Sequence, residues 1–354
     1  MTTDSETPSS EPPFTIHATR NFTQFLTEQK ISVAFTTYQA NKMFLIGTSA
    51  NQLKIEERTF ERSMGMAFHE DSLYLGTAYQ IWKLQNYIDN DEITAANDKV
   101  YVPNQSWVTG DIDIHDIAID ANGKPLFVNT VFSCISTTSD HASFDVVWKP
   151  PFISKLAPED RCHLNGMALV EGELNYVTAI SNSDVREGWR EHRQNGGIVI
   201  NTKNDDIVCT GLSMPHSPRV YKDKLWLLNS GKGEFGFIDL STGRFEATTF
   251  CPGYGRGLSI HNGYAFIGLS KPRKDGAFAG LELDEKLSRH NISAHCGILV
   301  IDLNTGDIVH SLMFEGVVRE LYDAAVLPGV ITPTLVGFKD DTIRKTIRIG
   351  NTIR

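Results

Sequence analysis

Short apolar runs separated by polar turns recur along the whole chain. In HLNGMALVEGELNYVT, residues 163–178, Gly166 precedes an apolar triplet, and a second apolar run ends at Val177. The same pattern occurs in MGMAFHEDSLYLGT from Met64 and in RGLSIHNGYAFIGLS from Arg256. Alternation of this kind, broken by Gly, Asn and Asp turns, predicts antiparallel β-hairpins.

The spacing of these hairpins predicts a repeat architecture. Taking the residue before each apolar triplet as an anchor, the intervals are 33, 51, 50, 52, 39 and 66 residues, and the anchors are Ser32, Gly65, Asp116, Gly166, Pro218, Gly257 and Asp323. Further alternating strands follow each hairpin. Four-stranded antiparallel units of ~40 to 50 residues are typical of β-propeller blades. We therefore expect an all-β propeller with seven blades, with six blades as the alternative.

The propeller is expected to form one domain over residues 14–354. The polar segment MTTDSETPSSEPP, residues 1–13, predicts a disordered N-terminal tail. The segment FTIHATR, residues 14–20, is expected to supply the outer strand of the last blade and to close the ring. The one plausible helix starts after Asn21, in NFTQFLTEQK.

Composition narrows the classes of partner. The chain has 354 residues, 41% of them hydrophobic, and a net charge of −10 without a Lys/Arg block, which argues against nucleic acid as a partner. It contains neither an apolar run long enough to span a bilayer nor a signal peptide, so we expect a cytoplasmic protein that does not bind membranes. The five cysteines have no CxxC spacing and are expected to be reduced and mainly buried.

Candidate chemistry gathers at the start of the innermost strands, which meet at one mouth of a propeller channel. Because side chains alternate along a strand, the positions one and three before each anchor are expected to point the same way. One before the anchor, repeats two to seven carry Met64, His115, Asn165, Ser217, Arg256 and Tyr322. Three before, they carry Arg62, Asp113, His163, Pro215, Tyr254 and Glu320. These two polar rings predict a site, with a hydrated structural channel as the alternative.

The residue types suggest roles for these side chains. His115, His163, Asn165 and Asp113 could hold a divalent metal cation, and neutral histidines hydrogen-bonded across the channel are the alternative. His115, His163 and Tyr322 are the candidates for acid and base catalysis. The candidates for substrate binding are Arg62, Arg219, Arg256, Tyr254, His216 and Glu320. For Arg256 a salt bridge to Glu320 or Asp323 is the alternative, and His216 and Arg219 could instead hold a loop against the next blade.

Two long insertions are expected to fold over this mouth. They are SNSDVREGWREHRQNGG, residues 181–197, and residues 271–297, and both fall between the second and third strands of a repeat. Both carry His, Arg and aromatic residues. Loops of this length commonly serve as lids or binding loops.

Four segments carry a family resemblance over nearly the whole chain. HDIAID, HLNGMALV, MPHSPR and GYGRGL resemble a bacterial family of conserved hypothetical β-propellers, sometimes joined to tetratricopeptide repeats. More distantly, NGMAL at residues 165–169 is similar to the NG motif of gluconolactonase and senescence-marker propellers, in which the Asn ligates a catalytic divalent cation. That resemblance implies Asn165 as a metal ligand, although the acidic ligands of that family have no counterpart here.

These observations predict an enzyme that acts on a small polar, anionic molecule at the channel mouth. Hydrolysis, elimination and isomerisation all suit a metal that polarises a carbonyl or activates water. The alternative is a non-catalytic propeller that binds a peptide, a glycan or a partner protein.

Overall fold

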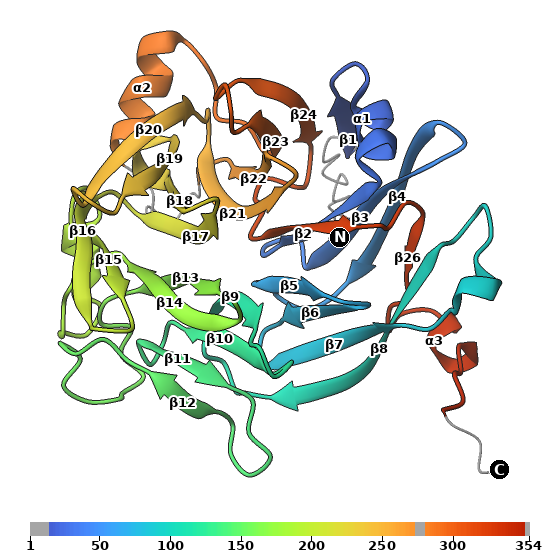
Figure 1. Ribbon diagram of the computed structural model, residues 1–354, viewed down its shortest axis with the longest axis horizontal. Coiled ribbons are helices and arrows are strands. Elements are labelled where there is room, and N and C mark those ends of the chain that lie inside the picture. The colour runs from blue at the N-terminus through green and yellow to red at the C-terminus, as the bar shows by residue number, and fades with distance from the viewer. Residues whose placement is uncertain (1–13, 273–279, 351–354) are drawn as a thin grey trace, which may run out of the picture.

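The computed structural model describes residues 14–272 and 280–350. Residues 1–13, for which the sequence predicts a disordered tail, lie outside these ranges. Six β-sheets stand around a central axis, which gives the β-propeller seen in Figure 1. The inner strands contact one another in the ring order β25, β5, β9, β13, β17 and β21. The prediction of an all-β propeller with four-stranded antiparallel blades is confirmed.

We number the blades I to VI from β5 onwards, with the inner strand first. Blade I contains β5 (Met66–His69), β6 (Ser72–Gly76), β7 (Gln80–Asn86) and β8 (Lys99–Val108). Blade II contains β9 (Ile114–Ile119), β10 (Pro125–Asn129), β11 (Cys134–Thr137) and β12 (Asp145–Trp148). Blade III contains β13 (Leu164–Val170), β14 (Glu173–Ala179), β15 (Gly197–Asn201) and β16 (Asp206–Leu212).

The second half of the ring follows the same order. Blade IV contains β17 (Pro215–Tyr221), β18 (Lys224–Asn229), β19 (Glu234–Asp239) and β20 (Arg244–Phe250). Blade V contains β21 (Tyr254–His261), β22 (Tyr264–Ser270), β23 (Gly297–Asp302) and β24 (Ile308–Glu315). Blade VI contains β25 (Ala324–Pro328), β2 (Ile31–Thr37), β3 (Lys42–Ser49) and β4 (Gln52–Thr59).

The favoured count of seven blades is wrong, because the first and last anchors belong to one blade. Ser32 lies on β2, and its backbone partner in the sheet is Leu327 of β25. The last repeat thus supplies the inner strand of blade VI, and the first repeat supplies its other three strands. This pairing of the two ends of the chain closes the ring.

Two blades carry a fifth strand. β1 (Thr15–Ala18) adds to β24 of blade V, and β26 (Pro333–Leu335) runs parallel to β8 of blade I. Residues 14–20 therefore do supply an outer strand, but they add it to blade V and not to the last blade as predicted. They do not close the ring, because the β25–β2 pairing does this one blade further on.

Helices are few and short. α1 (Phe22–Gln29) forms where predicted and buries Phe22, Phe25 and Leu26, although Asn21 adopts a left-handed conformation and makes no side-chain cap. The others are α2 (Glu282–His290), α3 (Thr342–Lys345), η1 (Asn90–Glu92), η2 (Gly188–His192) and η3 (Ser230–Lys232). No helix within the described ranges has the length and apolar character to cross a membrane.

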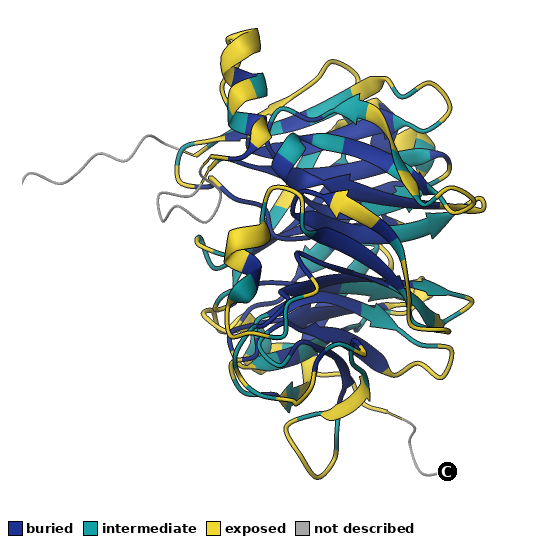
Figure 2. Ribbon diagram, turned by 90° about the vertical axis from the view of Figure 1, so that its left-hand side faces the viewer, coloured by how far each residue is buried: buried dark blue, intermediate teal, exposed yellow. Residues whose placement is uncertain are grey.

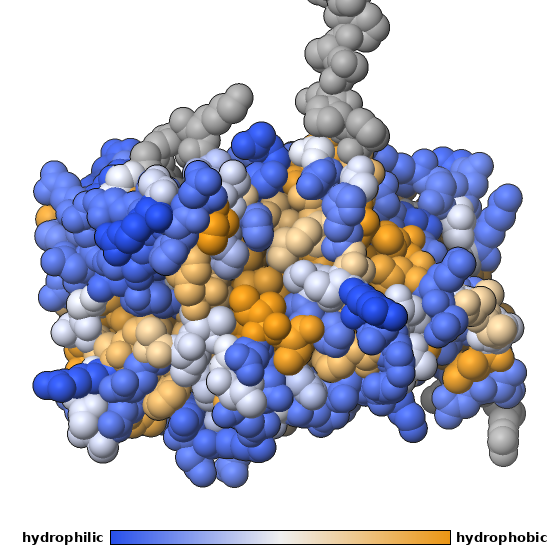
Figure 3. Space-filling model, turned by 90° about the horizontal axis from the view of Figure 1, so that it is seen from above, coloured by the Kyte–Doolittle hydropathy of each residue, from blue (hydrophilic) through white to orange (hydrophobic). Residues whose placement is uncertain are grey.

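The core lies between neighbouring blades, because each sheet buries both faces. The second strands β2, β10 and β18 are buried along almost their whole length, whereas turns and outer strands are more exposed (Figure 2). Between blades V and VI, for example, the rings of Phe35 and Phe44 stack at 4.7 Å, and Phe314 packs 4.9 Å from Phe35. On the rim of the ring, apolar side chains reach the surface between charged ones (Figure 3).

A narrow constriction crosses the channel at the level of the anchors. A Cβ atom on Gly65 would lie 2.8 Å from the backbone nitrogen of Asp116, so only glycine fits there. Asp116 accepts a hydrogen bond from the backbone of Met167 at 3.1 Å, and Asp323 accepts one from Met66 at 2.8 Å. These bonds connect blade II to blade III and blade VI to blade I, so polar acceptors link neighbouring blades around the constriction.

Below the constriction the six inner strands enclose a second space. This lower compartment has a volume of about 320 Å³, and both apolar side chains and polar groups, among them Ser259, line it. Arg219 lines it and forms a bidentate ion pair with Asp116, with Nη–Oδ distances of 2.8 and 3.0 Å. Arg219 therefore faces the lower compartment. Its predicted place at the opposite end of the channel, the mouth where the inner strands begin and which we call the upper mouth, is wrong.

Candidate functional site

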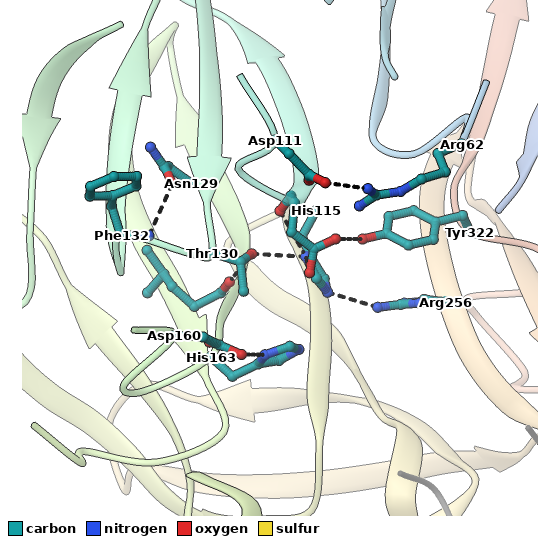
Figure 4. Close-up of polar contacts among 12 residues, drawn as sticks. Arg62, Asp111, His115, Asn129, Thr130, Phe132, Asp160, His163, Arg256 and Tyr322 are labelled. Atoms are coloured by element: carbon teal, nitrogen blue, oxygen red, sulfur yellow. Dashed lines mark hydrogen bonds and ion pairs between the residues drawn. The ribbon is translucent and has the colours of Figure 1, made fainter. Parts of the chain in front are cut away.

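His115 lies at the centre of the upper mouth, where β9 begins. Its Nε2 atom is 2.8 Å from Nη2 of Arg256, and its Nδ1 atom is 2.8 Å from the Thr130 hydroxyl and 3.1 Å from the carbonyl oxygen of Asp113 (Figure 4). Arginine only donates hydrogen bonds, so Nε2 must accept and Nδ1 must carry the proton. Burial and the nearby Arg256 hold the pKa of His115 well below its usual value, and the imidazole is neutral.

His163 forms a second polar centre with Asp160. The imidazole Nδ1 lies 2.8 Å from Oδ2 of Asp160, which also accepts a hydrogen bond of 2.8 Å from the indole of Trp189. The Trp189 ring packs 4.2 Å from the His163 ring, and His163 in turn lies edge-on to His115 at 4.8 Å. Nδ1 donates to the carboxylate, and Nε2 has no hydrogen-bond partner among residues 14–272 and 280–350.

Arg256 enters the mouth from blade V. Its guanidinium lies over the ring of Tyr322 at 4.0 Å, and Nη1 is 3.4 Å from a carboxylate oxygen of Glu320. The Nε atom is buried without a hydrogen-bond partner in the described part of the chain. The predicted ion pair with Glu320 is present, but it is long, and the main hydrogen bond of Arg256 goes to a neutral imidazole.

A small cavity adjoins Arg256. It has a volume of about 10 Å³, room for about one water molecule. His216, Tyr254 and Glu320 are among the residues that line it, and the Tyr254 hydroxyl donates to Asp284 of α2 at 3.0 Å. The ring of His216 lies 6.4 Å from that of His115, so His216 faces the channel rather than serving only to hold a loop.

Asp113 and Arg62 complete the upper mouth. Oδ1 of Asp113 accepts from the Tyr322 hydroxyl at 3.5 Å, and burial raises the pKa of the Asp113 carboxyl. Arg62 pairs with Asp111 at 2.5 Å (Figure 4). Its guanidinium lies over the ring of Tyr38, which stacks on Tyr322. Two arginines thus flank a stacked tyrosine pair.

Left-handed backbone sets the direction of three of these side chains. Arg62, Asp113 and His163 have φ values of 47°, 54° and 49°. Asp113 and His163 directly precede the inner strands β9 and β13, and Arg62 lies a few residues before β5. Such values are unusual for residues other than glycine and often occur at functional sites. They interrupt the strict alternation on which the prediction of two rings rested, yet side chains of both rings, such as His115 and His163, meet at the upper mouth.

The structure brings most predicted site residues together, but not all. Upper-mouth contacts connect His115, His163, His216, Arg256, Tyr322, Asp113, Glu320, Tyr254 and Arg62 directly or through one neighbour. Asn165 instead accepts a hydrogen bond of 2.7 Å from Thr178 of β14, and its buried Nδ2 atom has no partner in the described ranges. Arg219 faces the lower compartment.

The residues do not fit a divalent metal as they are placed. Both ring nitrogens of His115 form hydrogen bonds, and Asn165 turns its oxygen to Thr178. Within residues 14–272 and 280–350, no three His, Cys, Asp or Glu side chains form a group that could hold an ion. The metal stays a prediction, and the proton transfers proposed for His163 and His115 do not depend on it.

Both insertions contact the site. Trp189 lies in η2, within residues 181–197, and binds Asp160. Asp284 lies in α2, within residues 271–297, and accepts from Tyr254; residues 273–279 of this insertion lie outside the described ranges. Sequence reasoning missed Asp160, Trp189 and Thr130. Of these, only Trp189 gave a signal, as an aromatic residue within a long insertion.

Comparisons with known proteins support the fold. The model of a family described as "Domain of unknown function (DUF4915)" matches residues 20–336, and no curated protein matches the chain. A chain in the crystal structure of a nidogen/laminin complex is 11% identical, with a TM-score of 0.53 over 84% of this chain and 99% of that chain. A protein of unknown function from Bacteroides caccae is also 11% identical, with a TM-score of 0.50 over 84% and 98%. At this identity the likeness concerns the fold alone.

Proposed function

The chain belongs to the family described as Domain of unknown function (DUF4915), and we propose that it is an enzyme that transfers protons on a small anionic substrate in the upper mouth. The observation that supports this most strongly is the His163–Asp160 pair, in which Asp160 holds Nδ1 and leaves Nε2 without a hydrogen-bond partner in the described ranges, next to a cluster that contains a buried arginine.

His163 is the proposed general base. Asp160 fixes the tautomer in which Nε2 is unprotonated, and the packed Trp189 ring fixes the orientation of the imidazole. A carboxylate that holds the other nitrogen also stabilises the imidazolium that forms when the base takes a proton. General bases positioned in this way typically contribute 10²- to 10⁴-fold to a rate.

Arg256 is the proposed anion-binding residue. A buried guanidinium whose Nε atom lacks a partner is costly unless something binds it. A carboxylate would bind its fork of N–H groups more strongly than a neutral imidazole does. The face of Tyr322 holds the guanidinium plane in the mouth while the ligand binds.

A base next to a bound anion allows three classes of reaction. Removal of a proton from the carbon beside a carboxylate leads to elimination or isomerisation, and removal of a proton from water leads to hydrolysis. The predicted cytoplasmic location and small-molecule partner are consistent with each of them. The enzyme proposal therefore specifies proton transfer and an anionic substrate, without choosing among the three classes.

A binding screen followed by turnover tests this proposal. Small carboxylic acids are tested by thermal shift against the wild type and Arg256→Gln, and each hit is then followed by NMR for conversion. We expect hits that stabilise only the wild type, with about 2.7 kcal/mol at a ligand concentration of 100 times Kd. Conversion should be lost in His163→Gln while binding is kept. Ligands that bind the Gln variant equally well, or a peptide bound without turnover, would favour the binding-module alternative.

A divalent metal in the upper mouth, and the likeness to gluconolactonase-type propellers that suggests it, form a separate proposal with its own test. Asn165 as a ligand, by analogy with gluconolactonase-type propellers, requires its side chain to turn away from Thr178. Metal analysis of purified wild type, His115→Ala and His163→Ala tests this. Stoichiometric metal that is lost in both folded variants would support the metal, and metal kept in either variant would contradict it.

A further inference from the structure

Arg256 and His115 satisfy each other in the present structure. Nη2 of Arg256 donates to Nε2 of His115 at 2.8 Å, and the proton on Nδ1 is fixed by Thr130, whose hydroxyl donates to the carbonyl of Leu164 at 2.7 Å. Every proton in this chain of hydrogen bonds has one possible position, because its two ends are an arginine and a carbonyl group. His115 therefore has no lone pair available for chemistry while Arg256 occupies it.

A carboxylate at Arg256 competes with His115 for the same N–H groups. The cavity beside Arg256 has room for about one water, which is less than any carboxylate needs, so the ligand has to reach the guanidinium from the upper mouth. A charged acceptor makes hydrogen bonds about twice as strong as a neutral one does. Binding would consequently move the guanidinium onto the ligand and leave Nε2 of His115 exposed to the mouth.

We infer that a substrate carboxylate bound at Arg256 releases His115, which then takes up one proton from solvent and becomes a general acid opposite the His163 base. This inference rests on the proposed function and names the substrate class as carboxylates. The proton balance closes: solvent supplies one proton to Nε2, and the ligand supplies the negative charge that offsets it. The acid is thus formed only when the site is occupied.

The charges around His115 are compatible with this exchange. Among the described residues, burial and Arg256 keep its pKa low in the free protein, and the facing His163 and His216 act in the same direction. Asp113 Oδ2 lies only 3.6 Å from Nδ1 and would stabilise an imidazolium. Neutralising Arg256 with a carboxylate removes the charge that most directly opposes protonation. The titratable or charged groups that face His115 from neighbouring elements are Asp113, His163, His216, Arg256 and Tyr322.

NMR of the histidine side chains tests the inference without a known substrate. Protein labelled with ¹³C at histidine Cε1 is titrated with pH for wild type, Arg256→Gln and the control Arg62→Gln, and His115→Gln assigns the resonance. We expect the pKa of His115 to rise in Arg256→Gln and to stay unchanged in Arg62→Gln. Titration of the wild type with acetate should also raise the pKa of His115, whereas acetate should leave the pKa of His115 in Arg256→Gln unchanged.

The outcomes separate the two proposals. Acetate that stabilises the wild type in thermal unfolding but leaves the pKa of His115 unchanged overturns the release of His115 and keeps the anion site. Acetate that changes neither the stability of the wild type nor the pKa of His115 overturns the carboxylate site and both proposals with it. If Arg256→Gln fails to fold, the acetate titration of the wild type alone still decides.

Discussion

The buried carboxylate of Asp323 makes the stability of the propeller depend on pH. The side chain is 3% exposed and accepts hydrogen bonds of 2.8 Å from the backbones of Met66 and Ala324. Burial, followed by the nearby Asp116, raises its pKa from 3.8 to about 7. In the unfolded chain this group titrates near its ordinary value of about 3.9. Its contribution to stability is therefore complete below about pH 4 and is lost as pH rises towards 7.

The size of the effect follows from the shift. About three pH units at ~1.36 kcal/mol each give an upper limit of about 4 kcal/mol, shared by the Asp116–Asp323 pair. Asp323→Asn keeps a neutral side chain of the same shape at every pH. Its amide nitrogen cannot accept one of the two backbone N–H groups, so we expect the variant to be about 1 to 3 kcal/mol less stable than the wild type at pH 5, and to gain on the wild type as the pH rises to 8.

Urea unfolding at pH 5, 6, 7 and 8 measures this. The free energy of unfolding of the wild type should fall across the series relative to Asp323→Asn, so the difference between the two changes in favour of the variant. The exposed Asp140 offers a control, and Asp140→Asn should follow the wild type at each pH. Parallel curves for the wild type and Asp323→Asn would refute the reasoning, because they would show that Asp323 titrates alike in the folded and unfolded chain.

Three further predictions concern packing, positioning and reactivity. Gly257→Ala should destabilise by several kcal/mol in thermal unfolding, because φ is +78° and the new Cβ would lie 2.5 Å from a backbone nitrogen, whereas Gly211→Ala, at φ +79° in open space, should cost only about 1 kcal/mol. Trp189→Phe keeps the ring but loses the bond to Asp160, so turnover should fall roughly tenfold with ligand affinity unchanged. All five thiols are buried, and burial raises the pKa of Cys251 to about 12, so a thiol reagent should modify none in the folded protein and all five in urea.

The architecture of the blades could be predicted from sequence because each hairpin repeats the same apolar pattern. The blade count could not, because strand β2 has the pattern of an inner strand. Ser32 precedes Val33, Ala34 and Phe35, a small residue before an apolar triplet, just as Gly166 does in blade III. Second strands are buried on both faces and inner strands are largely buried, so their compositions overlap. Only the pairing of β2 with β25 distinguishes the two cases.

The candidate site was predictable for residues whose position depends only on their place at the start of an inner strand. His115 and Arg256 lie in the first residues of inner strands, His163 and Tyr322 lie just before inner strands, and the four side chains meet at the upper mouth. Their orientation was not predictable, because alternation assumes extended backbone, and His163 has a φ of 49°. Residues that come from other parts of the chain, such as Asp160, could be found only from the tertiary structure.

The constriction shows why buried carboxylates belong in this channel. Around the ring, blades with a glycine at the anchor (Gly65, Gly166 and Gly257) alternate with blades that have a hydrogen-bond acceptor near the anchor. These acceptors are Asp116, Ser217 and Asp323, and each accepts a backbone N–H from the following blade. Glycine brings the two backbones close, and the acceptor satisfies the N–H that this approach buries. The blades are therefore connected in pairs, with three acceptors for six blades. Arg256 does not line the lower compartment, so we expect its ligand to enter from the side where His163, Trp189 and the two insertions lie.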